Sequence, residues 1–113
     1  MNDCLFCKIV AGEIPSNKCY EDEAVLAFHD IDPKAPVHVL IIPKKHIVSV
    51  AQTKERDFDL YARIFSVAKK LAEEFDLKAG YRIVTNIGDE GGQAVAHLHF
   101  HLLGGRQFGW PPG

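Results

Sequence analysis

The sequence has no excess of basic charge and no long apolar run, and each absence argues against a class of partner. Its 13 lysines and arginines face 15 aspartates and glutamates, so the net charge is −2. A general nucleic-acid binder usually carries a strongly basic face, which this balance does not favour. The apolar runs, such as residues 39–43, are far shorter than a membrane span requires. We therefore expect neither a nucleic acid nor a membrane as partner.

Cysteine is also scarce. The chain has three cysteines, an odd number that argues against a disulfide framework and fits a reducing compartment. The first eight residues lack the charged and then apolar profile of a secretory signal. From these two features we expect a cytoplasmic protein. A length of 113 residues with 47% hydrophobic content fits a single domain over residues 1–113.

Hydrophobic periodicity predicts a strand-rich chain with one long helix in its middle. Apolar residues recur at three- and four-residue spacing over residues 53–75, which is typical of an amphipathic helix that Thr53 would cap. A short helix is expected over residues 4–11, since Gly12 and Pro15 follow it. Alternating or continuous apolar runs predict strands over residues 18–21, 24–29, 38–43, 81–86 and 94–103. This order predicts an α+β fold, with a mostly antiparallel sheet of about five strands, one long helix and one short helix.

Three histidines alternate with apolar residues in the last of these strands. Successive side chains of a strand point to opposite faces, so His97, His99 and His101 would project together. Three adjacent imidazoles cannot all be cationic without strong repulsion, which favours neutral rings near pH 7. A neutral imidazole nitrogen can be a nucleophile, a general base or a metal ligand. Two other interpretations stay open at this point: a solvent-facing edge strand and a strand that only binds metal.

A glycine-rich segment, residues 88–92, directly precedes the histidines. Because glycine has no side chain, a phosphate group could approach the backbone N–H groups around Gln93 and Val95. The segment therefore indicates phosphate chemistry next to a candidate histidine nucleophile.

Cys4 and Cys7 are separated by two residues, a gap that lets both thiolates reach one metal ion from a single helical turn. The pair supplies only half of a tetrahedral site. A redox pair is one alternative, but it normally follows a strand, and only three residues precede Cys4. Two buried cysteines without a metal are the other alternative. Cys19 shows no chemical role and is expected to be a packing residue.

The segment from Gln93 to Leu103 resembles the signature of the histidine triad (HIT) superfamily, in which three histidines alternate with hydrophobic residues. Further matches in order along the chain resemble its Hint branch, at residues 28–31, 35–38, 42–46, 86–88, 104–107 and 110–113. That branch comprises purine nucleoside phosphoramidate hydrolases. The resemblance implies cleavage of the P–N bond of AMP–amine conjugates through a nucleotidyl-histidine intermediate, with no organic cofactor.

The same resemblance implies a role for each histidine of the row and for one more. His99, the middle histidine, would attack the α-phosphorus. His101 would contact the phosphate and help the leaving group depart, and His38 would lie beside these two rings and hold them. His97 would join Cys4, Cys7 and His46 in a closed zinc site, which is structural because no coordination position stays open.

The resemblance also implies how a purine nucleotide is bound. Asn86 and the backbone around Gln93 and Val95 would position phosphate oxygens, while Asp30 would accept hydrogen bonds from the ribose hydroxyls. The base would lie in an apolar slot made by Leu5, Phe6, Ile9, Phe28, His29, Ile31 and Leu40. From the pattern alone, Phe28 and Ile31 are equally well explained as ordinary core residues.

Ala94 departs from the Hint pattern, which usually has a serine there. Alanine cannot form a hydrogen bond near the leaving group, so we expect slower turnover or a changed leaving-group preference. The resemblance further implies a homodimer that pairs through the long helix and the central strand. Two alternatives stay open: a dinucleoside polyphosphate hydrolase, as in the Fhit branch, against which residues 110–113 argue, and a nucleotide-binding adaptor or signalling protein.

Overall fold

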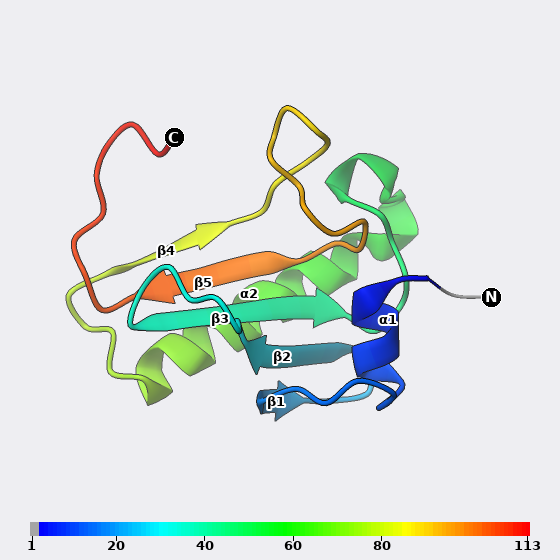
Figure 1. Cartoon of the computed structure of the whole chain (residues 1–113), viewed down its shortest axis with the longest axis horizontal. Coiled ribbons are helices and arrows are strands. Elements are labelled where there is room, and N and C mark those ends of the chain that lie inside the picture. The colour runs from blue at the N-terminus through cyan, green and yellow to red at the C-terminus, as the bar shows by residue number, and fades with distance from the viewer. Residues whose placement is uncertain (1–2) are drawn as a thin grey trace.

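A five-stranded antiparallel sheet organises the protein, with a long helix across one face and a short helix on the other (Figure 1). The computed structural model describes residues 3–113; Met1 and Asn2, the first residues of the expected domain, lie outside the described residues. The elements in chain order are α1 (Leu5–Val10), β1 (Lys18–Glu21), β2 (Val25–His29), β3 (Val37–Pro43), the 3-10 turns η1 (Val50–Gln52) and η2 (Glu55–Asp57), α2 (Phe58–Glu74), β4 (Tyr81–Val84) and β5 (Phe100–Gly104). The sheet order is β1-β2-β3-β5-β4, which confirms the expected α+β class. Within residues 3–113, no helix is both long and apolar enough to cross a membrane.

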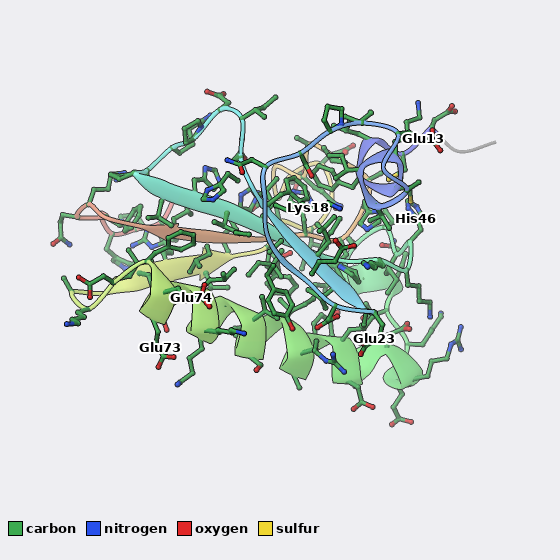
Figure 2. The ribbon with its side chains drawn as sticks, turned by 90° about the horizontal axis from the view of Figure 1, so that it is seen from below. Glu13, Lys18, Glu23, His46, Glu73 and Glu74 are labelled. Atoms are coloured by element: carbon green, nitrogen blue, oxygen red, sulfur yellow. The ribbon has the colours of Figure 1, made fainter. Side chains whose placement is uncertain are left out.

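Strand alternation divides the core into two layers. Val39 and Ile41 of β3 face α2 and belong to the larger buried cluster, together with Ile64 and Leu71 of that helix. Side chains that alternate with them face the opposite side, where Phe6 and other α1 residues cover one end of β2 and β3. Figure 2 shows α2 below the sheet and α1 above it. His38, His99 and His101 point to this upper face, because they alternate with residues that face α2.

The long helix begins later than expected, at Phe58 rather than near residue 53. Thr53 does not cap it, because its hydroxyl donates to the Val50 carbonyl (2.7 Å) and closes the turn η1 instead. Asp57 then accepts a hydrogen bond from the Lys54 N–H (2.8 Å) and pairs with Lys45 (2.6 Å), so one more 3-10 turn forms before α2. Local side-chain bonds of this kind compete with helix at positions that the hydrophobic pattern alone assigns to it.

The last strand also begins later than expected, at Phe100 rather than at residue 94. The register pairs Ile41 with Phe100, so an extended ladder would bring Pro43 opposite Leu98. Proline has no N–H to donate, and the Leu98 N–H donates to the Ile47 carbonyl instead (2.6 Å). The ladder therefore ends at this point. The alternation of side chains continues beyond the ladder, since Leu98 and Phe100 both lie in the core layer between the sheet and α2.

Candidate functional site

Three histidines from neighbouring backbone segments meet on the upper face of the sheet. His38 lies in β3, His101 lies in the adjacent β5, and His99 directly precedes β5. The ring centroids of His99 and His101 are 5.1 Å apart, and those of His38 and His101 are 5.2 Å apart. His38 and His99 are buried, while His101 is partly exposed. The structure thus brings together the three residues that the sequence identified as catalytic candidates.

The hydrogen bond of His99 determines which of its nitrogens carries a lone pair. Its Nδ1 lies 2.7 Å from the carbonyl oxygen of His97. A carbonyl can only accept, so Nδ1 carries the proton and donates it. In the neutral ring, Nε2 is then unprotonated and available as a nucleophile.

A second chain of hydrogen bonds fixes His38 and His101. The Lys34 backbone N–H donates to His38 Nδ1 (3.0 Å), so the proton of the neutral His38 ring is on Nε2. That Nε2 lies 2.9 Å from His101 Nδ1 and 3.5 Å from a carboxylate oxygen of Asp30, both of which can accept from it. His101 consequently carries its own proton on Nε2 and can donate it to a bound group.

Burial keeps both of these rings neutral. It lowers the pKa of His101 to about 4, with further contributions from the nearby His99 and His38 rings. Burial also lowers the pKa of His38, partly opposed by the Asp30 carboxylate. Neutral rings are what the crowding of histidines in the sequence predicted.

The expected base slot is only partly assembled. Phe6, Ile9, Phe28 and Leu40 form one buried cluster, against which Val95 packs. Phe6 links this cluster to the candidate catalytic histidines, since its ring meets the His99 ring edge-on at 5.1 Å.

Three other expected members of the slot are not part of this buried cluster. The side chain of Ile31 is fully exposed and that of Leu5 is 45% exposed. The His29 ring packs edge-on against Phe75 at 5.6 Å, on the α2 face of the sheet. His29 and Phe28 are consecutive strand residues, so they point to opposite faces.

The expected phosphate-binding residues are positioned by the loop that precedes the histidines. The Gln93 side chain accepts from the Gly88 N–H (3.0 Å) and donates to the carbonyls of Val48 (2.6 Å) and Val95 (3.0 Å). The Gln93 N–H itself donates to the Gly88 carbonyl. Gln93 therefore fixes the conformation of this loop through hydrogen bonds. Asn86 lies partly buried just beyond β4.

Four metal-binding side chains converge beside α1. Cys4, Cys7, His46 and His97 each offer one ligand atom, and these four atoms lie within 4.8 Å of one another. The two Nδ1 atoms are 3.2 Å apart, and the sulfur-to-nitrogen distances are 3.2 Å (Cys4–His97), 3.3 Å (Cys7–His46) and 3.5 Å (Cys7–His97). In a tetrahedron around zinc, nitrogens lie about 3.4 Å apart and a nitrogen lies about 3.6 Å from a sulfur. The donor set and its spacing thus fit zinc.

The protonation of His97 agrees with this assignment. Its Nε2 lies 2.8 Å from the Pro43 carbonyl, which can only accept, so the lone pair of the neutral ring is on Nδ1, the atom that faces the cluster. Burial lowers the pKa of His97 and raises that of Cys4. A cation among these groups would favour the thiolate and the neutral imidazole together.

The model of the family described as HIT domain matches residues 11–108. The chain belongs to the HIT family. A "14 kDa zinc-binding protein" of Zea mays is 50% identical over 111 residues, covering 96% of this chain and 87% of the relative. "Adenylylsulfatase HINT1" of Arabidopsis thaliana is 47% identical over 111 residues, covering 96% of this chain and 76% of the relative. A solved "HIT family hydrolase" from Legionella pneumophila Philadelphia 1 is 54% identical with a TM-score of 0.96, covering 98% of this chain and 100% of that one.

These similarities confirm the resemblance and the fold that it implied. They do not bear on the backbone groups that set the histidine protons, which sequence reasoning missed. The Lys34 N–H and the carbonyls of Pro43 and His97 have no sequence signature. Every residue has a backbone carbonyl, and every residue except proline has a backbone N–H.

Proposed function

We propose that the protein hydrolyses the P–N bond of purine nucleoside 5′-phosphoramidates, such as AMP–amine conjugates, through a nucleotidyl-histidine intermediate. One observation carries the proposal: the hydrogen bond from His99 Nδ1 to the His97 carbonyl leaves the lone pair of His99 Nε2 available for attack. Membership of the HIT family and the relatives described as hydrolases support hydrolysis as the class of reaction.

The reaction has two displacement steps at phosphorus. In the first, His99 Nε2 bonds to the α-phosphorus while the P–N bond breaks, and the amine leaves with that electron pair and a proton from the medium. The His97 carbonyl stabilises the positive charge that develops on the His99 ring, and the Nε2–H of His101 donates to the phosphate or to the leaving nitrogen. In the second, water attacks phosphorus, the electron pair returns to His99 Nε2, and the nucleotide leaves as water loses a proton to the medium.

The nucleotide would lie across the upper face of the sheet. The apolar cluster that contains Phe6, Phe28 and Leu40 would contact the purine, with Ile9 and Ile31 at its margins. Asp30 would bind the ribose, and it is already fixed because one carboxylate oxygen accepts from the Asp32 N–H (2.8 Å). Phosphate oxygens would be bound by Asn86 and by the backbone around Gln93 and Val95. We leave His29 out of the pocket, since its ring faces α2.

Zinc would be held by Cys4, Cys7, His46 and His97, a proposal that the convergent ligand atoms and the name of the Zea mays relative support. A four-ligand zinc site supplies stability rather than a position for substrate. Its effect on catalysis would be indirect: α1 would be fixed against the sheet, and with it the Phe6 ring that contacts His99.

We also propose that two copies pair along α2 and the sheet. Phe65 of α2 is 48% exposed although its ring meets Phe100 at 5.8 Å, and Tyr81 of the edge strand β4 is 40% exposed. An edge strand beside exposed aromatic side chains is suited to join a second copy of the sheet. Trp110, with 84% of its surface exposed, would reach toward the neighbouring site.

A mixed phosphate–sulfate anhydride is a second candidate substrate. A relative 47% identical to this chain is named an adenylylsulfatase. The same attack by His99 would then release sulfate, which leaves with the electron pair of the P–O bond and needs no proton. A dinucleoside polyphosphate would react in the same way and release a nucleotide.

A substrate panel separates these candidates. AMP–amine conjugates, adenosine 5′-phosphosulfate and dinucleoside polyphosphates would be compared by kcat/KM for the unmodified protein and for His99→Gly. We expect the AMP–amine conjugates to react fastest and His99→Gly to lose at least about a thousandfold in kcat while still binding AMP. Preference for another substrate would contradict the assigned leaving group, and full turnover by His99→Gly would contradict the assigned nucleophile. An adaptor would bind AMP without turnover of any of the three.

A further inference from the structure

The proton on His38 is set by one backbone group in the loop between β2 and β3. The Lys34 N–H donates to His38 Nδ1 (3.0 Å), which places the His38 proton on Nε2 and directs it to His101. The Lys34 ammonium group is directed away from His38, because it pairs with Asp32 (2.7 Å) at the surface. The orientation of the Lys34 backbone therefore depends on what holds this loop in place.

The segment that follows β5 holds the loop through one side chain. Arg106 Nε donates to the Lys34 carbonyl (2.9 Å), and the neighbouring Gly105 lies so close to Pro36 that an added Cβ would come within 2.9 Å of it. The Arg106 guanidinium is itself fixed, since it lies 4.2 Å from the Phe108 ring centre and donates to the Gln107 carbonyl (3.1 Å). Gly105 and Arg106 thus contact the loop between β2 and β3, whose Lys34 N–H sets the position of the His38 proton.

We propose that Arg106 is a positioning residue for the pair His38 and His101. By holding the Lys34 carbonyl, it keeps the N–H of the same residue directed at His38 Nδ1, which in turn leaves a proton on His101 Nε2. The inference rests on the proposed function for its kinetic consequence, because the Nε2–H of His101 is the donor to the phosphate or the leaving group. Its structural part, the tautomer of His38, does not depend on the substrate.

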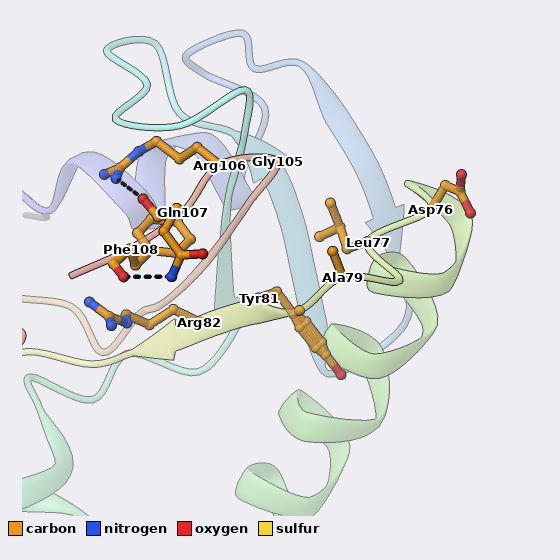
Figure 3. Close-up of a pocket in the computed structure, with 10 residues that line it drawn as sticks. Asp76, Leu77, Ala79, Tyr81, Arg82, Gly105, Arg106, Gln107 and Phe108 are labelled. Carbon is orange, nitrogen blue, oxygen red and sulfur yellow. Dashed lines mark hydrogen bonds between the residues drawn. The ribbon is translucent and has the colours of Figure 1, made fainter. Parts of the chain in front are cut away.

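Arg82 supplies a matched control on the same aromatic ring. Figure 3 shows Arg82 and Arg106 on two sides of Phe108, beside a cavity of about 480 Å³. The Arg82 guanidinium lies 5.1 Å from the ring centre, and it donates to the Gly109 carbonyl (2.8 Å) rather than to the β2–β3 loop. Removal of Arg82 would loosen the tail in a comparable way while the bond to Lys34 stays.

Two substitutions of Arg106 differ only in the decisive group. Both shorter side chains end at the position of Arg106 Nε: Arg106→Met has a methyl group there and no donor, whereas Arg106→Gln has an amide nitrogen that can donate. The tautomer of His38 is read from the ¹⁵N chemical shifts of its ring nitrogens, and kcat and KM are measured with an AMP–amine conjugate. Thermal unfolding of each variant checks that it is folded.

We expect the unmodified protein and Arg82→Met to have His38 protonated at Nε2. Arg106→Met should populate the other tautomer or exchange between the two, with kcat lowered about five- to tenfold and KM changed less than twofold. Arg106→Gln should restore most of the Nε2-protonated His38 tautomer and most of kcat. A His38 spectrum in Arg106→Met identical to that in Arg82→Met would overturn the inference, as would a failure of Arg106→Gln to rescue. If no AMP–amine conjugate is hydrolysed, the proposed function fails, and the spectra still decide the role of Arg106.

Discussion

Removal of zinc from the proposed site should release α1 while the sheet stays folded. A helix of six residues is too short to be stable alone, so α1 depends on its contacts. Burial of Phe6 and Ile9 contributes about 3–6 kcal/mol, whereas fixing the six backbone positions costs about 6–12 kcal/mol. The entropic cost exceeds the contribution of burial by about 3–6 kcal/mol, so the bonds from Cys4 and Cys7 to a shared ion would decide whether the helix is docked.

Amide hydrogen exchange, measured with and without a chelator, tests this dependence directly. We expect exchange in α1 to accelerate at least about a hundredfold after chelation, which corresponds to about 3 kcal/mol of lost local stability. Protection in β3 and α2 should persist. Cys7→Ala should behave like the chelated protein, whereas Cys19→Ala, outside the cluster, should not. Unchanged protection of α1 after zinc is removed would refute the structural role of the metal.

Three further predictions concern the catalytic histidines, the leaving-group side and the dimer. Because the pKa of His101 is about 4, below the ordinary 6.5, the folded chain binds fewer protons than the unfolded chain between these values. The neutral His101 ring therefore stabilises the folded chain fully above pH 6.5, and this contribution is lost as the pH falls toward 4. Between these pH values the urea midpoint of His101→Asn should fall less steeply than that of the unmodified protein; equal slopes would contradict a neutral His101. Ala94→Ser should raise kcat/KM for AMP–amine conjugates about fivefold, the value of one hydrogen bond of about 1 kcal/mol, and an unchanged value would remove the idea. Phe65→Glu should convert the proposed dimer to monomers in sedimentation experiments, whereas a dimer that persists would exclude this face.

The period-two pattern allowed much of the sheet and the grouping of the histidines to be predicted. It could also have excluded His29 from the base slot, because β2 residues that alternate with Phe28 face α2. The predicted first residues of β5 and α2 were wrong, for reasons that the hydrophobic pattern does not contain. Pro43 of β3 ends the hydrogen-bond ladder between β3 and β5. The Asp57 side chain accepts from the Lys54 N–H and so forms a turn before α2. The first effect arises from the pairing of two strands that only the folded chain brings together, and the second from a local side-chain bond that hydrophobic periodicity does not report.

The chemistry of the site was predictable in its residue types but not in its proton positions. Histidine spacing indicated nucleophile, assistant and metal ligand, and the structure brings the corresponding rings together. Which nitrogen acts in each ring follows from backbone partners, such as the His97 carbonyl for His99. The backbone conformation of the folded chain sets these partners, so no residue pattern reports them.

In the proposed mechanism, His99 Nε2 becomes covalently bonded to phosphorus during turnover. The most direct measurement is mass spectrometry of protein stopped within the first turnover of an AMP–amine conjugate, under neutral or alkaline conditions that preserve a P–N bond. The nucleotidyl-histidine mechanism predicts one adenylyl group per chain, located on the peptide that contains His99 and missing in His99→Gly. An adenylyl group on another residue, or AMP released in the first turnover without any adduct, would contradict it.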